Sequence, residues 1–295
     1  MKLLKTYING NYSVSIFEDG TKIRKTNDDE FIAEFPENID LKITNYCEKG
    51  CPMCHEKSNK DGLHSDILNE KFIKSLVPGT EVALGGGMVT KYPHLKQLLE
   101  KLKKRGIIAN MTLHQEEFLE NKEFVDEMIT NKLVYGIGVS LHNCNDEFIN
   151  VVKEYPNVVV HTIAGITTLK DYHKLTNNGL KILILGYKNF GRGIEYFDKY
   201  QEIVNKNIKE LNENLMSLLK QFKVVSFDNL ALKQLEVQNK VSKETWEEFY
   251  MGDDGQHTMY IDAVERTFAK NSTRSIRYKL MNDIKDMFKV VKEEK

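Results

Sequence analysis

The sequence predicts an α/β protein whose central part is a partial (βα)6 barrel, with small β-containing extensions at both ends. Strand-like and amphipathic helical segments alternate from residue 39 to about residue 187, which favours parallel strands, right-handed crossovers and helices on the outside. The terminal segments instead carry hairpin signals. With 295 residues, 41% hydrophobic and 29% charged, the chain can bury one large core or two modest ones.

Residues 1–38 are expected to form the first domain, a β-hairpin element. The segments 12–17 and 21–24 are strand-like, and Glu18-Asp19-Gly20 lies between them. Asp-Gly between two such segments is a hairpin signal. Pro36 then ends a short apolar stretch, so the main repeat begins after it.

Residues 39–230 are expected to form the partial barrel. The predicted strands are 39–44, 81–84, 107–113, 135–141, 158–163 and 181–185. The predicted helical segments between them are 66–77, 94–105, 118–131, 146–154 and 169–177. A long charged helix over 195–222 and a further strand or barrel-closing segment over 223–228 complete this part.

Residues 231–295 are expected to form a separate α+β extension. Trp246 and Tyr250 indicate an aromatic helix, and residues 252–255 read Gly-Asp-Asp-Gly, which is typical of a turn. The segments 258–262 and 267–269 predict a second hairpin. This extension could pair with the N-terminal hairpin as a structural cap, or it could provide a docking surface beside the barrel mouth.

The composition excludes several classes of protein. Forty-two basic and 43 acidic side chains give a formal charge of −1, so no global field favours nucleic acid or an anionic membrane. No apolar stretch approaches 18 residues, and the N-terminus lacks the apolar segment of a signal peptide. Four cysteines, three of them clustered, do not make a disulfide framework. We expect a soluble, cytoplasmic protein with reduced thiols and no membrane partner.

Three of the four cysteines, Cys47, Cys51 and Cys54, follow the first predicted strand within eight residues. Three thiolates on one loop can bind three irons of a [4Fe–4S] cluster and leave the fourth iron open for a small molecule. Three alternatives stay open. The C-x-x-C pair fits a glutaredoxin-type site, and C-x-x-C-H fits haem attachment. A Cys3His zinc site could use His55 or His64 as its fourth ligand.

The C-x3-C-x2-C spacing resembles the radical S-adenosylmethionine (SAM) superfamily. The resemblance implies that SAM binds the fourth iron and is cleaved reductively into methionine and a 5′-deoxyadenosyl radical, which abstracts a substrate hydrogen. It also implies a partial (βα)6 barrel and a one-electron donor such as flavodoxin or ferredoxin. Residues 231–295 contain no cysteine, so a single cluster without an auxiliary-cluster extension is expected.

The resemblance also suggests cofactor contacts, which fall at strand ends, where parallel α/β proteins bind ligands. Gly85-Gly86-Gly87 is similar to the family's Gly-Gly-Glu element, which holds the amino group of SAM, although Met88 replaces the acid. A tight turn is the alternative explanation of this triplet. Met53 occupies the position that packs on adenine. Ser140 matches a residue that meets ribose or carboxylate, and a helix cap near Asn145 is its alternative role.

Other strand ends carry further candidates. Ile163 and Gly165 partly match the family's adenine-contacting stretch, in which His161 replaces a glycine and Thr168 a glutamate. Lys188 and Arg192 could hold SAM's carboxylate or an anionic substrate, or they could be solvated charges.

His114 ends the third strand, where its side chain could face the substrate as the candidate catalytic residue. A core or surface histidine is the alternative. Cys144, the fourth cysteine, is assigned no role.

The sequence therefore predicts a single-cluster radical SAM enzyme with an unidentified substrate. A peptide or protein substrate is favoured, and a nucleotide or other small molecule comes next. The alternatives are a zinc-stabilised Cys3His interaction protein and a non-catalytic iron–sulfur binding protein.

Overall fold

The computed structural model describes residues 2–294 and contains two sheets. The smaller sheet is antiparallel, with strand order β1-β2-β3. Its strands are β1 (Leu3–Asn9), β2 (Tyr12–Phe17) and β3 (Lys22–Lys25). The predicted hairpin is therefore confirmed as β2 and β3. Sequence reasoning missed β1, whose mixed burial pattern lacks the clean alternation of β2.

The main sheet has ten strands in the order β10-β9-β8-β7-β6-β5-β4-β11-β12-β13. The strands from β4 to β10 follow one another in the chain and pair in parallel, so the predicted α/β class is confirmed. All six predicted strands are present, and the predicted further strand is β10. These seven strands are β4 (Asn38–Thr44), β5 (Glu81–Gly86), β6 (Ile108–His114), β7 (Gly136–Ser140), β8 (Val158–Ile163), β9 (Lys181–Leu185) and β10 (Val224–Phe227).

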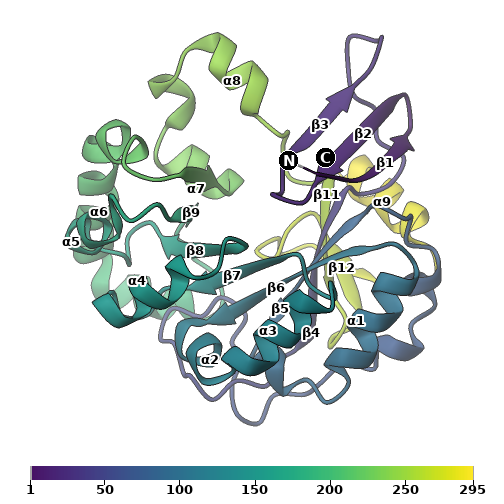
Figure 1. The fold of residues 1–295 in the computed structure, drawn as a ribbon, viewed down its shortest axis with the longest axis horizontal. Coiled ribbons are helices and arrows are strands. Elements are labelled where there is room, and N and C mark those ends of the chain that lie inside the picture. Colours follow the sequence, from purple (N-terminus) through teal and green to yellow (C-terminus); the bar gives the residue numbers. More distant parts are fainter. Residues whose placement is uncertain (1, 295) are drawn as a thin grey trace.

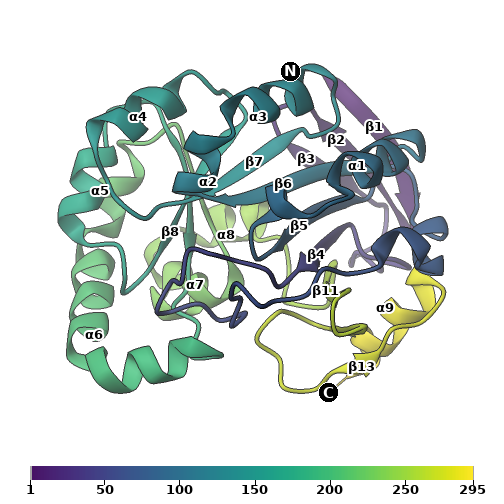
Figure 2. The same ribbon diagram turned by 90° about the horizontal axis from the view of Figure 1, so that it is seen from below.

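Helices connect these strands on one side of the sheet (Figure 1, Figure 2). They are α1 (Leu95–Lys104), α2 (Gln115–Glu120), α3 (Lys122–Thr130), α4 (Asp146–Lys153), α5 (Leu169–Leu175) and α6 (Arg192–Leu219). The helix predicted over 118–131 is divided between α2 and α3 at Asn121, and α6 is kinked at Tyr200. Among residues 2–294, no helix combines the length and apolar character needed to span a bilayer.

The amphipathic helix predicted over 66–77 is wrong. This segment forms only two short 3-10 helices, η1 (Ile67–Asn69) and η2 (Lys71–Lys74). Glu70 has an extended backbone between them, and its carboxylate pairs with Arg266 from the C-terminal segment. The crossover from β4 to β5 therefore contains no α-helix.

The C-terminal segment adds strands to the main sheet. It contains β11 (Thr258–Asp262), β12 (Thr267–Ala269), β13 (Tyr278–Lys279) and the helices α7 (Asn229–Gln234), α8 (Lys243–Phe249) and α9 (Ile284–Glu293). The predicted hairpin is confirmed as β11 and β12, and the aromatic helix as α8. The prediction that this hairpin pairs with the N-terminal hairpin is wrong, because β11 pairs in parallel with β4.

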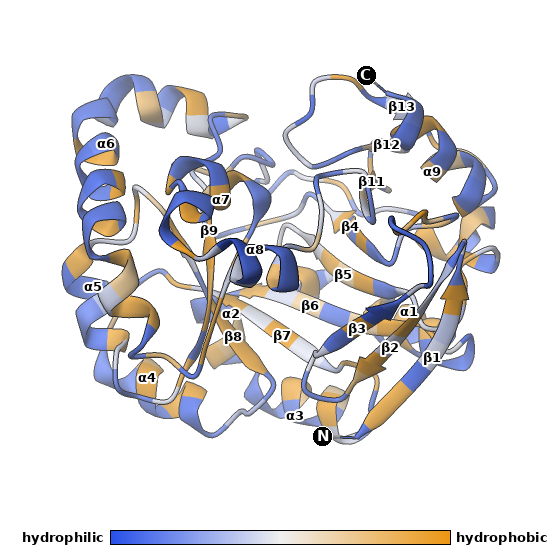
Figure 3. Ribbon diagram, turned by 90° about the horizontal axis from the view of Figure 1, so that it is seen from above, coloured by the Kyte–Doolittle hydropathy of each residue, from blue (hydrophilic) through white to orange (hydrophobic). Residues whose placement is uncertain are grey.

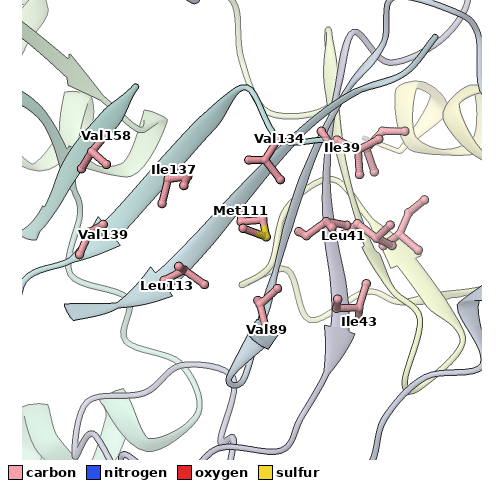
Figure 4. Packing of buried hydrophobic residues seen from close by; sticks show 14 of the residues in the cluster. Ile39, Leu41, Ile43, Val89, Met111, Leu113, Val134, Ile137, Val139 and Val158 are labelled. Atoms are coloured by element: carbon pink, nitrogen blue, oxygen red, sulfur yellow. The ribbon is translucent and has the colours of Figure 1, made fainter. Parts of the chain in front are cut away.

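The two faces of β4 differ in character. Ile39, Leu41 and Ile43 are fully buried and pack with residues of β6 and β7 (Figure 4). The alternate residues Asn38, Asp40 and Lys42 lie on the opposite face, which we call the inner face. In Figure 3 the helices α4–α6 carry both hydrophilic (blue) and hydrophobic (orange) residues, as expected of helices that cover one face of a sheet.

Candidate functional site

The cysteine loop, residues 45–65, follows β4 at its carboxyl end. Cys47, Cys51 and Cys54 are partly exposed free thiols on this loop. The Cys47 amide donates to the Asn59 carbonyl at 2.8 Å, and the Cys54 amide donates to the Cys51 carbonyl at 3.2 Å. Backbone hydrogen bonds therefore fold the loop that carries the three cysteines at the end of β4.

The three thiols influence one another electrostatically. Burial, with Cys54 as a further cause, raises the pKa of the Cys47 and Cys51 thiols. Deprotonation of Cys47 and Cys51 is therefore unfavourable unless a cation offsets the negative charge. Within residues 2–294, no three His, Cys, Asp or Glu side chains converge on a single metal position. A cubane cluster differs from a single ion because each thiolate binds its own iron, so this donor set fits a cluster.

The histidines that could complete a zinc site have other partners. His55 Nε2 lies 3.3 Å from a carboxylate oxygen of Glu56 and 3.4 Å from Lys188 Nζ. His64 Nδ1 lies 2.8 Å from the Thr44 hydroxyl. Neither contact directs the imidazole to a cysteine, so the geometry of these two residues does not favour the Cys3His alternative.

The glycine triplet packs against the start of the cysteine loop. Gly86 has φ of +112°, and a Cβ atom there would lie 2.2 Å from the Thr44 carbonyl oxygen. A Cβ atom on Gly87 would lie 2.0 Å from the Tyr46 carbonyl oxygen. The Gly87 amide already donates to Thr44 at 2.8 Å, so the carbonyls are the groups of this turn that suit an ammonium group. Glycine is needed here for the close approach of two backbones.

Met88, at the family's acidic position, is 2% exposed and belongs to the buried core. Its amide donates to the Tyr46 carbonyl at 2.7 Å. The side chain therefore contributes packing, and any contact of this element with a cofactor has to come from the backbone.

Ser140 and His114 lie opposite each other at the ends of β7 and β6. The capping alternative for Ser140 is wrong, because Asn145 caps α4 and accepts from the Phe148 amide at 2.9 Å. His114 is the N-cap of α2, and its Nδ1 accepts from the Glu116 amide at 3.2 Å. Burial and the nearby His142 lower the pKa of His114, so its imidazole is neutral near pH 7. Its local contacts are those of a structural residue, and its catalytic role stays a prediction.

Gly165 and Ile163 lie at the end of β8. Gly165 has φ of +92° and packs against α6, where Asn207 Nδ2 donates to its carbonyl at 3.1 Å. Ile163 is partly exposed on the same face as His161. Cys144 is 5% exposed, and its thiol donates to the Asp171 carbonyl at 3.5 Å, so it is a core residue with a local partner.

Lys188 and Arg192 bring the β9–α6 connection to the cysteine loop. Arg192 Nε donates to the Cys51 carbonyl at 3.1 Å, and its Nη1 donates to the Ser58 carbonyl at 2.9 Å. Its amide donates to the Cys54 carbonyl at 3.1 Å. Arg192 therefore holds the cysteine loop, a role that sequence reasoning missed. Met53 lies in the same loop and is partly exposed.

A network of charged residues that was not predicted anchors the other side of the cysteine loop. We call Lys42, Glu56, Tyr260 and Asp262 the loop anchor. Lys42 Nζ lies 3.0 Å from Glu56 and 3.1 Å from Asp262, and the Tyr260 hydroxyl donates to Glu56 at 3.0 Å. The two carboxylates raise the pKa of Lys42 despite its burial, so it stays charged. The loop is thereby fixed between β4 and β11.

His161, on the inner face of β8, was noted only as a departure from the family pattern. A Cβ atom on Gly138 would lie 2.1 Å from its ring, so the glycine makes room for the imidazole. Burial and the nearby Lys188 lower the pKa of His161 to about 4, so its ring is neutral near pH 7. The sequence offered only the glycine and the histidine on neighbouring predicted strands, since Gly138 pairs with Val159 in the register and its contact with His161 depends on the fold.

Searches against protein-family models and curated proteins found no match. Among solved structures, the fold is similar to that of SuiB from Streptococcus suis, with a TM-score of 0.61 and 12% identity over 99% of this chain and 87% of that one. For SuiB bound to the precursor peptide SuiA, the TM-score is 0.58 with 14% identity, over 87% of this chain and 65% of that one. For SuiB bound to S-adenosylmethionine, the TM-score is 0.56 with 11% identity, over 84% of this chain and 64% of that one. The chain thus spans slightly less than two thirds of SuiB in both ligand-bound structures. At this level of identity, the comparisons show that the two proteins share a fold.

Proposed function

We propose that the chain is a radical SAM enzyme with a single [4Fe–4S] cluster on the cysteine loop. The observation that carries the proposal is the position of three free cysteines on a folded loop at the carboxyl end of the first strand of a SuiB-like fold. The glycine turn after the next strand packs directly against that loop. In this proposal the parallel strands β4 to β9 form the partial (βα)6 barrel.

The residues present fit the cluster and its ligand. Cys47, Cys51 and Cys54 would hold three irons, and SAM would occupy the fourth. Met53, Ser140, Ile163 and Gly165 would line the SAM site, with the carbonyls of Gly85-Gly86-Gly87 near its ammonium group. When bound and reduced, the cluster supplies the electron that cleaves SAM to methionine and the 5′-deoxyadenosyl radical.

The charged residues around the loop have separable roles in this proposal. Lys188 lies 3.4 Å from His55 and 3.1 Å from Ser272, so its ammonium group has neutral partners and is suited to SAM's carboxylate. Arg192 would act mainly by holding the loop carbonyls. The reductant would be a small one-electron donor such as flavodoxin or ferredoxin.

A peptide is the proposed substrate class. Support comes from the similarity of the fold to SuiB, which has been crystallised with a precursor peptide. The present chain covers 65% of that SuiB chain, and the identity is 14%. The peptide assignment therefore rests on a shared fold and is tested separately from the cluster.

Alanine variants of the four cysteines test the cluster. Cys47→Ala, Cys51→Ala and Cys54→Ala should each lose iron and SAM cleavage after anaerobic reconstitution, because each thiolate holds a different iron. Cys144→Ala is the matched control and should retain both. Iron and zinc content, the electron paramagnetic resonance signal of the reduced protein and 5′-deoxyadenosine yield are the measurements.

Three outcomes would contradict the proposal. Retained SAM cleavage in Cys47→Ala would exclude the three-cysteine cluster. Stoichiometric zinc in place of iron would favour a zinc-stabilised interaction protein. An iron-loaded wild-type protein that forms no deoxyadenosine would favour the non-catalytic iron–sulfur alternative.

A further inference from the structure

The helix α6 begins directly against the cysteine loop. Its first residue, Arg192, donates from Nε to the Cys51 carbonyl at 3.1 Å and from Nη1 to the Ser58 carbonyl at 2.9 Å. Its amide donates to the Cys54 carbonyl at 3.1 Å. Two of these three carbonyls belong to proposed cluster ligands. Arg192 is therefore held against two of the three ligand residues.

The backbone before Arg192 also touches the cysteine loop. Gly191 has φ of +60°, and a Cβ atom there would lie 2.2 Å from the His55 carbonyl oxygen. Glycine is therefore needed at this position, both for its conformation and for the close approach of the two backbones. As a result, the position of Arg192 at the loop is fixed by the main chain as well as by its side chain.

The charge of Arg192 is not offset by a carboxylate. Its guanidinium group donates to neutral carbonyls, and within residues 2–294 it forms no ion pair. Lys49, a cation inside the cysteine loop, instead lies 3.0 Å from Glu116 and 3.2 Å from Glu120. The cation of the loop anchor is likewise shared by two carboxylates. Arg192 therefore contributes a net positive charge at the loop, whereas these two lysines do not.

The orientation of α6 adds to this positive charge. The helix runs from Arg192 to Leu219, so the end that meets the loop is its amino end. The free amide groups of a first helical turn carry partial positive charge and stabilise negative charge nearby. The guanidinium group and the helix dipole therefore act in the same direction on any charge that the loop holds.

We propose that Arg192, at the amino end of α6, raises the reduction potential of the cluster on the cysteine loop. This inference rests on the proposed function and names the residue that governs reduction of that site. Reduction adds one electron from the one-electron donor, and so one negative charge, while no bond forms or breaks. A fixed cation stabilises the more negative, reduced form, and net charge and hydrogen bonding are among the factors that set cluster potentials.

Midpoint potentials of the reconstituted protein test this role. They are measured without SAM by anaerobic titration with dithionite and redox mediators, with the electron paramagnetic resonance signal of the reduced protein as the readout. Arg192→Gln removes the charge and keeps an amide donor. At a fixed potential its ratio of reduced to oxidised protein should fall at least about tenfold, which is about 59 mV for a one-electron couple.

The matched control is Lys60→Gln, which removes an exposed cation of the same loop. Its charge is screened by water and salt, so the ratio should change less than about threefold. A shift in Lys60→Gln equal to that in Arg192→Gln would show that any cation of the loop has this effect, and it would overturn the assignment to Arg192.

Arg192→Lys separates the charge from the loop contacts. Lysine keeps the charge but lacks the planar fork that reaches two carbonyls. This variant should retain less iron than the wild type, while its midpoint potential stays close to the wild-type value. A shift as large as that of Arg192→Gln would mean that loop geometry sets the potential, which would overturn the proposal. An unchanged potential in Arg192→Gln would overturn it as well.

Substitutions of Ile194 test the same charge effect with the contacts of Arg192 intact, should Arg192→Gln fail to retain a cluster. Ile194 lies in the first turn of α6 and is 45% exposed. In low-salt buffer, where charges act over longer distances, Ile194→Lys should raise the midpoint potential and Ile194→Glu should lower it. Equal potentials in these two variants would overturn the proposal.

The wild-type protein distinguishes failure of this inference from failure of the proposed function. If the reconstituted wild type shows no signal of a reduced cluster, the proposed function is wrong and the inference falls with it. If the wild type is reduced and forms deoxyadenosine, but Arg192→Gln keeps its potential, the enzyme class stands and the role of Arg192 in reduction is wrong.

Discussion

Charged side chains at the two ends of β4 form ion pairs, whereas Asp40 in the middle of the strand forms none within the described residues. At the amino end, Glu37 is 1% exposed and pairs with Arg24 at 2.8 Å and with Lys22 at 3.3 Å. At the carboxyl end, Lys42 pairs with two carboxylates. Between them, the exposed side chain of Asp40 has no partner within the described chain. The strand thus has an ion-pair network at each end and an unpaired carboxylate between them.

The paired charges at the two ends of β4 have a positioning role. Buried charges are costly unless they are paired and hydrogen-bonded, and pairing fixes their geometry. The paired ends therefore hold the N-terminal sheet and the cysteine loop in place. Asp40 is exposed, so water can hydrogen-bond to its carboxylate and no protein partner is needed to fix it. The following predictions test the two paired ends, beginning with the largest expected effect.

Replacement of Lys42 should cause the largest loss in the free energy of unfolding. Lys42→Met removes the cation that Glu56 and Asp262 share, and breaking a buried ion pair in this way costs about 3–5 kcal/mol. The control is Lys96→Met, which removes an ion pair with Glu127 whose side chains are 54% and 43% exposed. It should cost less than about 1 kcal/mol. Urea unfolding of the apoprotein measures both, and equal costs would show that the loop anchor does not hold this end of β4.

The glycine turn provides an intermediate effect. Gly87→Ala places a Cβ atom 2.0 Å from the backbone of Tyr46, so we expect a loss of about 1–3 kcal/mol in unfolding free energy and a lower iron content. Gly85→Ala is the matched control, since nothing lies within 4 Å of its Cβ position. Similar urea midpoints in the two variants would contradict the close approach of the turn to the cysteine loop.

The amino end of β4 should show a smaller, pH-dependent effect through His257. Its Nδ1 lies 3.1 Å from the Tyr12 hydroxyl, and burial together with Arg24 lowers its pKa to about 4. Between pH 6.5 and 4 the unfolded chain binds a proton here that the folded chain does not, so stability falls as the pH falls. The slope is about 1.4 kcal/mol per pH unit for this group.

His257→Gln should therefore lose less stability than the wild type between pH 7 and pH 5. Urea midpoints of the apoprotein at the two pH values give the difference. An unchanged pH dependence would mean that His257 is not held neutral at the amino end of β4.

The regular part of the fold was predictable from the sequence because its signals are local. Strands β4 to β9 carry apolar alternation, and their crossovers are amphipathic. The pairing of β11 with β4 was not predictable, since strand pairing between distant segments leaves no local pattern. The helix expected over 66–77 is replaced by two short 3-10 helices with an extended Glu70 between them, although the apolar spacing of the segment is helical.

The candidate metal-binding residues could be predicted from the sequence, but the residues that hold the cysteine loop in place could not. The cysteine spacing and the glycine triplet are short motifs with a direct chemical meaning. The contacts of Arg192 and Tyr260 with the cysteine loop depend on the fold, and neither residue lies near the cysteines in sequence. One signal was overlooked, since Asn38, Asp40 and Lys42 alternate with Ile39 and Leu41 and so indicated a polar face on the first strand.

The insertion of β11 beside β4 has a consequence for biosynthesis. Tyr260 and Glu56 are 204 residues apart, so the cysteine loop leaves the ribosome long before its anchor on β11 exists. Pairings at such sequence separation form slowly, because the ends of a long loop must first meet. The nascent chain therefore exposes three unanchored thiols during most of its synthesis. On the proposed function, stable loading of iron should therefore follow the docking of β11 on β4.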